Sequence, residues 1–428
     1  MDGIVFSSFK SKKQPLSVKP LSVLRELIMA VLLIWLMCPY QNFFGNWYIY
    51  GGLWIGWIII AFMTDPTAFR YMAFSKYTWV ALSWPCSIFL LSLVDWADFS
   101  PYQFTIVLVV SAFVYYAKGN HVKALRFLIA VYVAYAIMIS AFSIQQLQIN
   151  PEISRLLANS DKNITSAFAG PFMANFSFVN GLTLVSLFWV FNFKTTHNKR
   201  IRLFSLLMVV IGIYLLVCAQ YSIALFLFVI FAFIVWMFNS KRQRSSSTKV
   251  FFLVFGLLIL LPFAGNILLS LSDIIPPGYV ARRLKSLGMM LNFDGIQQGS
   301  DLEDRMQLYK LSISTFFHNF FIGVGGKYYG ANGLVGGHSQ ILDNFAYYGI
   351  LFGGQFVWYL VCSFKNGEVF LKDDFKHTYK MIFIVYMIQC LLNTSYNEEM
   401  LFTIFFIVPS LIYLAQYDRI KVGMEAKS

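Results

Sequence analysis

The sequence predicts an all-α, polytopic membrane protein with about 12 transmembrane helices, on three observations. Apolar residues make up 58% of its 428 residues and charged residues only 12%, and the mean hydropathy is +0.64. The apolar residues form runs of about 20, the length that a helix needs to cross the hydrocarbon core. Basic residues recur in every second connection between these runs. A soluble domain carries roughly 25% charged residues, so the soluble classes are excluded.

The runs divide one polytopic domain, residues 1–428, into candidate spans. Charged residues within the spans lie near their ends, as Arg25, Glu26, Arg126 and Arg202 do. In chain order the spans are 22–40, 47–63, 77–94, 101–117, 122–143, 171–193, 201–219, 221–238, 250–270, 345–364, 379–394 and 400–416.

Lysine and arginine mark one side of the membrane. The amino-terminal tail, the tail after the last span and alternate connections are basic, whereas the other short connections are acidic (Asp95 and Asp98; Glu398 and Glu399) or neutral. Because positive connections stay in the cytoplasm, both termini are predicted to be cytoplasmic. The long connections 144–170 and 271–344 then lie outside. The net charge of +13 follows from this topology, and no nucleic-acid partner is expected.

The composition gives no sign of a cofactor. The five cysteines all lie in apolar runs and form no CxxC pair, so neither a disulfide framework nor a metal site is expected. The first apolar run lacks a small-residue cleavage site and is predicted to be an uncleaved span. In the first long connection, residues 150–158 predict a short helix at the membrane interface.

The connection 271–344 is the largest polar segment. Its "SDLE", residues 300–303, has the form of a capping box and predicts a helix through about Phe317. Arg305 lies in the first turns of this helix, four residues after Asp301. The next segment, 323–337, holds seven glycines in fifteen residues. Glycine at this density indicates positive φ angles or a close backbone approach. The spacing is not that of a dinucleotide-binding fingerprint.

The stretch "GGHSQILDNFAYYG", residues 336–349, predicts another helix with His338 at its start. A helix amino terminus disfavours a charged imidazole, and a neutral histidine there can accept a proton from a hydroxyl group. Simpler interpretations stay open for each candidate. His338 can bond a loop carbonyl, Arg305 can pair with Asp301, and Asp343 can bond backbone or Ser339 one turn earlier. Arg282 and Arg283 can reach lipid headgroups.

The segment from Arg305 to Gly354 resembles the signature region of the O-antigen ligase and polymerase superfamily, and its Wzy-type repeat-unit polymerases most closely. That pattern is an arginine opening a helix, then N-x-F-x-G-x-G, then a glycine-flanked H-S before a span with G-x-x-G-G. The matching residues are Arg305, Asn319, Phe321, Gly323, Gly325, His338, Ser339, Gly349, Gly353 and Gly354. The stretch 170–178 resembles a weaker element of the family.

The resemblance implies a metal-independent, inverting glycosyltransferase of the membrane-embedded GT-C type. Donor and acceptor would be oligosaccharides on undecaprenyl diphosphate, and the product an O-antigen, capsular or exopolysaccharide of the cell envelope. His338 would be catalytic, and substrate would be bound by Arg305, Arg282, Arg283, Ser339, Gln340 and Asp343. Chain-length regulators and flippases would be candidate partners in the bacterial inner membrane. One departure is that Tyr221 and Ser222 stand where the family often has Ser-Arg. Arg282 or Arg283 is the candidate replacement.

Two other functions stay open. An O-antigen ligase uses the same kind of donor but transfers finished glycan to lipid A-core or a protein, and its outer loop would look alike. A lipid-linked oligosaccharide flippase would also have about twelve spans. Coupled transporters usually bury ionisable groups in mid-membrane, and the sequence instead gathers its polar residues in an outer loop. The resemblance favours the polymerase.

Overall fold

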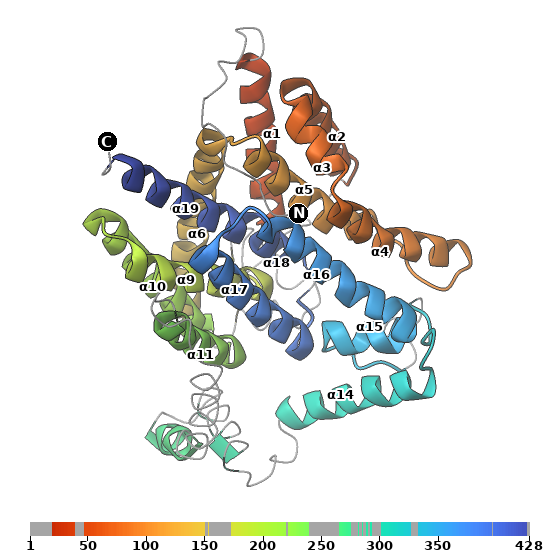
Figure 1. The fold of residues 1–428 in the computed structure, drawn as a ribbon. Coiled ribbons are helices and arrows are strands. Elements are labelled where there is room, and N and C mark those ends of the chain that lie inside the picture. The colour runs from red at the N-terminus through yellow and green to blue at the C-terminus, as the bar shows by residue number, and fades with distance from the viewer. Residues whose placement is uncertain are drawn as a thin grey trace.

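The computed structural model describes residues 19–38, 47–149, 153, 173–219, 221–238, 265–274, 281, 285, 288, 289, 292, 301–326, 333–395 and 397–425. Every regular element in these residues is helical, which confirms the predicted all-α class (Figure 1). The first half contains α1 (Lys19–Leu36), α2 (Trp47–Thr64), α3 (Pro66–Ala73), α4 (Lys76–Leu93), η3 (Pro101–Phe104), α5 (Thr105–Lys118), α6 (Val122–Ile149), α9 (Phe176–Thr195), α10 (Lys199–Ala219) and α11 (Ser222–Phe238). The second half contains α14 (Asp301–His318), α15 (Gln340–Tyr348), η5 (Gly349–Gly353), α16 (Gly354–Glu368), α17 (Asp373–Leu392), α18 (Glu398–Phe402), η6 (Thr403–Ile407) and α19 (Val408–Glu425).

Several helices are long and apolar enough to cross a membrane. Within the described residues five such helices occur, at Val122–Ile149, Phe176–Thr195, Lys199–Ala219, Gln340–Glu368 and Glu398–Val422. Shorter apolar helices cover Tyr48–Thr64, Thr105–Lys118 and Ala224–Trp236. The chain is therefore a helical membrane protein. The predicted span 250–270 lies outside the described residues apart from 265–270, and the predicted interface helix 150–158 lies outside them apart from Ile153.

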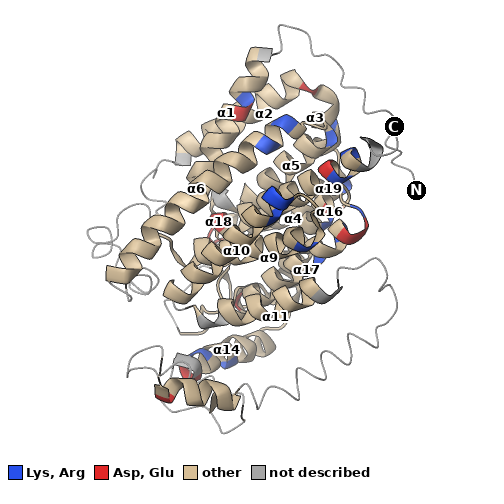
Figure 2. Cartoon of the chain, turned by 90° about the vertical axis from the view of Figure 1, so that its left-hand side faces the viewer, with Lys and Arg blue, Asp and Glu red and all other residues tan. Residues whose placement is uncertain are grey.

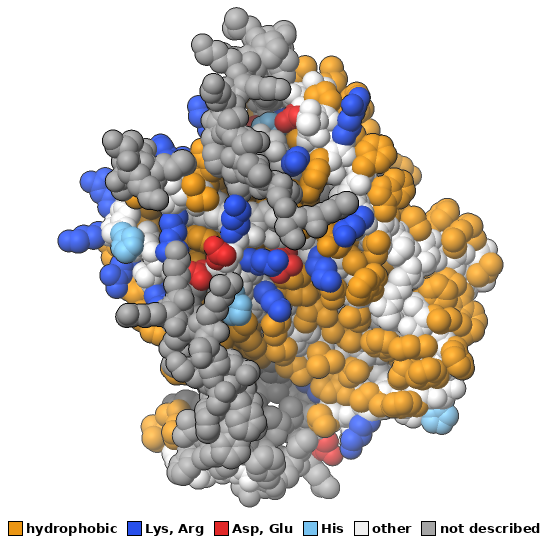
Figure 3. Space-filling view, in the orientation of Figure 1, with side chains coloured by type: hydrophobic (Ala, Val, Ile, Leu, Met, Phe, Trp, Pro, Cys, Tyr) orange, Lys and Arg blue, Asp and Glu red, His pale blue; other side chains and the backbone are white. Residues whose placement is uncertain are grey.

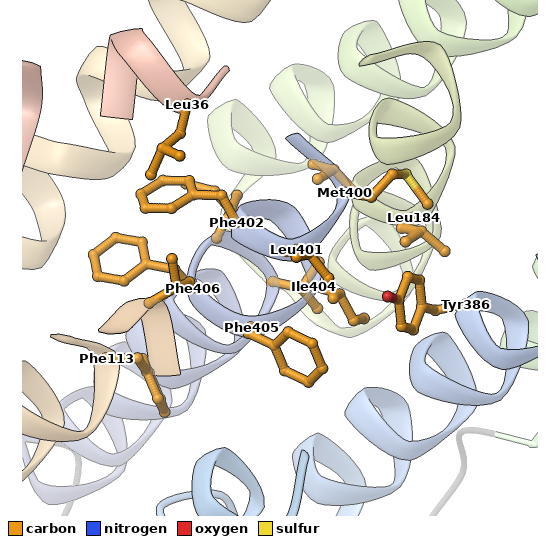
Figure 4. Close-up of a cluster of buried hydrophobic side chains, with 14 of the residues drawn as sticks. Leu36, Phe113, Leu184, Tyr386, Met400, Leu401, Phe402, Ile404, Phe405 and Phe406 are labelled. Atoms are coloured by element: carbon orange, nitrogen blue, oxygen red, sulfur yellow. The ribbon is translucent and has the colours of Figure 1, made fainter. Parts of the chain in front are cut away.

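The centre of the molecule is the continuous rod formed by α18, η6 and α19. About 89% of its most apolar stretch is buried inside the protein, against 28% for α10 at the periphery. A helix that is apolar all round is stable where neighbours cover every face. Aromatic side chains of η6 pack against α5 and α17 around this rod, with Phe405 and Phe406 fully buried (Figure 4). The rod positions the elements on either side of it.

The periphery carries the apolar surface that lipid would cover. Trp79, Leu90 and Trp358 are more than half exposed on α4 and α16. Figure 3 shows a broad apolar area on this side of the molecule and a separate gathering of Lys and Arg. Many Lys and Arg residues lie on the side of α3 and of the α16–α17 connection, and α14, which carries Arg305 and Lys310, lies at the opposite edge from α1, α2 and α3 (Figure 2). The polar helix α14 is thus set apart from that basic side.

Two acidic residues stand at the start of the last predicted span. Glu398 and Glu399, predicted in the short connection before residues 400–416, form the first turn of α18. Glu399 is only 1% exposed and its Oε1 accepts a hydrogen bond of 2.9 Å from Nδ2 of Asn175. The other end of the Asn175 amide caps α9 by accepting from the N–H of Phe178. The Asn175 bond gives this buried acidic side chain a partner where water is excluded.

Candidate functional site

Helix α14, predicted from the capping motif, is present as Asp301–His318 and holds Arg305 on its inner side. Nη1 of Arg305 donates a 3.0 Å hydrogen bond to Oδ1 of Asn393, and the hydroxyl of Tyr309 donates to the carbonyl of Leu392 at 2.6 Å. Both acceptors lie at the carboxyl end of α17, where helix carbonyls lack partners and the dipole attracts cations. The predicted partner Asp301 has a side chain outside the described set. Burial raises the pKa of Tyr309, although Arg305 opposes this, so the phenol stays a proton donor.

The glycine-rich segment returns along α14. The hydroxyl of Ser312 accepts the N–H of Gly336 at 2.9 Å, and the hydroxyl of Thr315 donates to the carbonyl of Leu334. A Cβ atom at Gly336 would lie 2.2 Å from the carbonyl oxygen of Leu308. Only glycine therefore permits this approach, which is one of the two uses expected of the glycines.

Helix α15 begins where the glycine segment ends. Ser339 is its N-cap and accepts the N–H of Leu342 at 3.1 Å. Asp343 accepts the N–H of Ser339 at 2.9 Å and the hydroxyl of Ser312 at 2.6 Å. Ser339 is fully buried and both Asp343 oxygens are bonded, so the two side chains fix the start of α15 against α14. Asp343 thus bonds the backbone of Ser339 one turn earlier, as the simpler of the two interpretations of this residue expects.

His338 stands one residue before this cap. Its side chain is exposed, and no residue in the described part of the chain hydrogen-bonds to it. It therefore lies at the start of α15, as the sequence predicts, and directly precedes the N-cap. The neighbouring N–H of Gln340 donates to the carbonyl of Asn393 at 3.1 Å. Since the amide of Asn393 also accepts from Arg305, one residue joins the arginine helix to the histidine turn.

The predicted span 345–364 lies within a longer helical stretch, Gln340–Glu368, whose start agrees with the helix predicted for residues 336–349. The stretch is broken at Gly349, which has a φ of +63°. The segment 319–326 fills the break with backbone hydrogen bonds. The carbonyls of Ala346 and Tyr347 accept from Val324 and Gly325, and the N–H groups beyond the break donate to 320 and 321. A break in an apolar helix is stable only where such partners replace the lost bonds.

A cavity of about 360 Å³ lies along α15 and reaches Tyr348, directly before the break at Gly349. One helical face of α15 lines it, because the lining positions 340, 343, 344, 347 and 348 follow helical spacing. Aromatic rings close one end: Trp84 packs edge-on against Tyr348, with centroids 5.5 Å apart, and against Phe356 at 5.2 Å. The remaining lining residues are Asp98, Gln103, Gly326 and Thr394.

The structure thus brings together Arg305, His338, Ser339, Gln340 and Asp343, whereas Arg282 and Arg283 lie outside the described residues. The sequence missed Trp84, Gln103 and Asn393. Trp84 lies in the middle of α4 and Gln103 in η3, far from the loop in sequence, and only the fold places them next to α15. Asn393 has a local signal, because an asparagine directly after an apolar run often ends a helix.

The described part of the chain contains no group of three or more His, Cys, Asp and Glu side chains placed to hold a metal ion. No family model matches the chain, and no curated protein is significantly similar to it.

Proposed function

We propose that the protein is a repeat-unit polymerase that joins oligosaccharides carried on undecaprenyl diphosphate. The observation that supports this most is the environment of His338. It is exposed and has no bond to the described residues, yet the turn that carries it is tied at Ser312, Ser339 and Asp343. A histidine held in place by its backbone, with its ring left open, suits proton transfer with a substrate.

The reaction assigns a separate task to each side chain. An oxygen of the acceptor hydroxyl attacks the anomeric carbon of the donor, whose bond to the diphosphate breaks with both electrons going to the leaving phosphate oxygen. His338 takes the hydroxyl proton. Arg305 stabilises the charge that grows on the diphosphate, since cations near a developing charge lower the barrier. Arg305 hydrogen-bonds to Asn393 and to Tyr309, and its five N–H groups leave further donors for phosphate oxygens.

The topology that this function needs is the predicted one: twelve spans, cytoplasmic termini and residues 271–344 outside a bacterial inner membrane. The separation of α14 from the basic side supports it. The test is labelling of single cysteines with a membrane-impermeant reagent, in a background without the five native cysteines. Cells with a permeabilised outer envelope should be labelled at Gly333→Cys and protected at His197→Cys, and the reverse pattern would invert the topology.

An O-antigen ligase is the alternative within the enzyme class, and it would use the same two side chains. Deletion of the gene followed by sizing of surface glycan separates the two. Loss of a polymerase leaves single repeat units attached to the surface, whereas loss of a ligase leaves lipid-linked polymer and no displayed glycan.

A transporter of lipid-linked oligosaccharides is favoured by one observation, the buried Glu399 at the start of an apolar span. Ionisable groups at such depth often serve transport. Its bond to the cap of α9 gives it a structural task instead. Deletion of the gene also distinguishes a flippase from a polymerase, because loss of a flippase leaves repeat units on the inner side of the membrane. Glu399→Gln should retain polymer formation, as glutamine can keep the bond from Asn175.

A further inference from the structure

We propose that the cavity along α15 binds the terminal sugar of the acceptor, as an uncharged sugar ring, and so selects which glycan is extended. This assignment rests on the proposed function. The cavity is defined by its position: it begins at Gln340, two residues after His338, and runs along α15 to Trp84 and Phe356. A ring held there would present its hydroxyl groups toward the histidine turn.

The shape and lining of the cavity fit a sugar. Its volume of about 360 Å³ is near the lower end of the roughly 300–1,000 Å³ found for small-ligand sites. Amide and carboxylate groups gather toward the amino end of α15, and aromatic rings toward its carboxyl end. A sugar ring has this same division, since its C–H faces pack on aromatic rings while its hydroxyls need hydrogen-bond partners. A purely apolar ligand would leave the amides without partners.

Two side chains have hydrogen-bonding capacity left for such hydroxyls. Oε1 of Gln103 is shielded from solvent and has no partner in the described part of the chain, although its Nε2 donates to the carbonyl of Asp98 at 3.3 Å. The side chain of Gln340 likewise makes no hydrogen bond to the described residues. Asp343 differs because both its oxygens are bonded. A buried amide oxygen without a donor is costly, and a sugar hydroxyl would supply the donor.

The charge of the lining excludes the other parts of the substrate. Among the residues that the structure describes, no lysine, arginine or histidine lines the cavity, whereas Asp98 and Asp343 do. A diphosphate, or the sugar directly attached to it, would therefore be repelled. Arg305, which could attract phosphate, lies on α14 outside the cavity lining. The terminal sugar of the acceptor is the part farthest from any phosphate, and a uronic acid in that position should be rejected.

The test is saturation-transfer NMR on the purified full chain in a zwitterionic detergent that carries no sugar. The probes are the methyl glycosides of glucose, galactose and N-acetylglucosamine, with those of glucuronic and galacturonic acid, at millimolar concentration. At least one neutral glycoside should show transfer and the uronic acids none. Absence of transfer from every neutral probe, or equal transfer from the uronic acids, would overturn the assignment.

Matched variants tie the signal to the cavity. Gln340→Leu and Gln103→Leu should weaken binding about tenfold, as expected for loss of a buried hydrogen bond. Gln307→Leu, on the exposed side of α14, should bind as wild type does. Trp84→Ala should abolish binding while Trp79→Ala, more than half exposed on the same helix, should not. If Trp84→Ala does not fold, the glutamine variants still decide, and unchanged binding in both would contradict the assignment.

The binding test is independent of turnover. A protein that binds neutral sugars through Gln340 but never extends lipid-linked repeat units would contradict the proposed function and leave the cavity as a sugar site. A protein that extends repeat units, with equal efficiency in Gln340→Leu and wild type, would support the function and contradict the cavity assignment.

Discussion

Two arginines, Arg25 and Arg305, lie in polar clusters with opposite character. Arg25 is only 2% exposed, forms an ion pair with Glu26 and donates to the hydroxyls of Thr64 at 2.8 Å and of Tyr115. Arg305 is half-buried, and its side chain hydrogen-bonds to Asn393 and to Tyr309. The first arginine joins α1, α2 and α5 and is paired with a carboxylate, whereas the second forms no ion pair with the described residues.

The same contrast holds for the two histidines of these clusters. Nε2 of His121 lies 3.3 Å from Oδ2 of Asp65, and the ring stacks on Tyr115 with centroids 5.3 Å apart. His338 is exposed and makes no hydrogen bond to the described residues. A polar cluster whose charged side chains pair with one another within the protein stabilises the fold. A polar cluster that is held by its backbone and leaves side chains unpaired can bind a substrate. The number of polar residues alone does not distinguish these two kinds of cluster.

Arg25→Met should produce the largest loss of stability. The substitution leaves Glu26 and Tyr115 without their cation, and breaking a buried pair costs roughly 3–5 kcal/mol. Thermal unfolding of the purified protein in detergent measures it. Arg200→Met, at an exposed position on α10, is the control and should unfold as wild type does. Equal stability of Arg25→Met and wild type would show that the Arg25 cluster is not structural.

Gly349→Ala should damage the broken helix. Its φ of +63° is strained for alanine, and a Cβ atom would lie 2.3 Å from the carbonyl carbon of Phe321. Left-handed strain alone costs about 1–3 kcal/mol, so stability and activity should both fall. Gly354→Ala, which has open space and helical geometry, should be neutral or stabilising by about 0.5–1 kcal/mol. A harmless Gly349→Ala would mean that the break is not needed.

Arg305→Lys should reduce polymerisation about ten- to a hundredfold while leaving stability unchanged. Lysine keeps the charge but loses the planar fork, and a hydrogen bond to a charged group contributes about 1.5–3 kcal/mol. Chain extension of lipid-linked repeat units by purified protein measures the rate. Asn393→Ala separates the roles, because it removes the hydrogen bond within the protein and keeps the cation. If Asn393→Ala loses as much activity as Arg305→Lys, the arginine acts as a structural tie.

Asp65→Asn should produce a small loss of stability that depends on pH. Burial alone would raise its pKa, but His121, the N–H of Ala68 and Arg25 hold the pKa below its usual value. A lowered pKa stabilises the fold above the unfolded value of about 3.9, and this stabilisation is lost as the pH falls through the folded pKa. Asp65→Asn keeps a capping group and loses only the charge, so its deficit at neutral pH should vanish in acid.

The capping role of Asp65 is measured separately. Its Oδ1 accepts the N–H of Ala68 at the start of α3. Asp65→Ala should unfold more easily than Asp65→Asn by about 1 kcal/mol at neutral pH, the usual worth of an N-cap. Identical stability of the two variants would show that capping by the residue 65 side chain does not stabilise α3.

Much of the fold was predictable because apolar length and charge act locally along the chain. The helix α14 followed from the capping motif before it and α15 from the length of its stretch, and the glycines at 323, 325, 333 and 337 do have positive φ angles. The break at Gly349 was not predictable, because it depends on backbone partners from 320–325, outside its own helix. The cavity was also missed, since Trp84 and Gln103 meet α15 only through tertiary packing.

The most direct test of the proposed reaction compares the two histidines that bracket the glycine-rich segment. His318 ends α14, is exposed, and its Nδ1 lies 2.8 Å from the carbonyl of Ser314. Chain extension by purified protein on lipid-linked repeat units should be abolished in His338→Ala and unaffected in His318→Ala, with both variants unfolding at the wild-type temperature. Chains of wild-type length from His338→Ala would contradict the central claim and reduce the histidine to a surface residue.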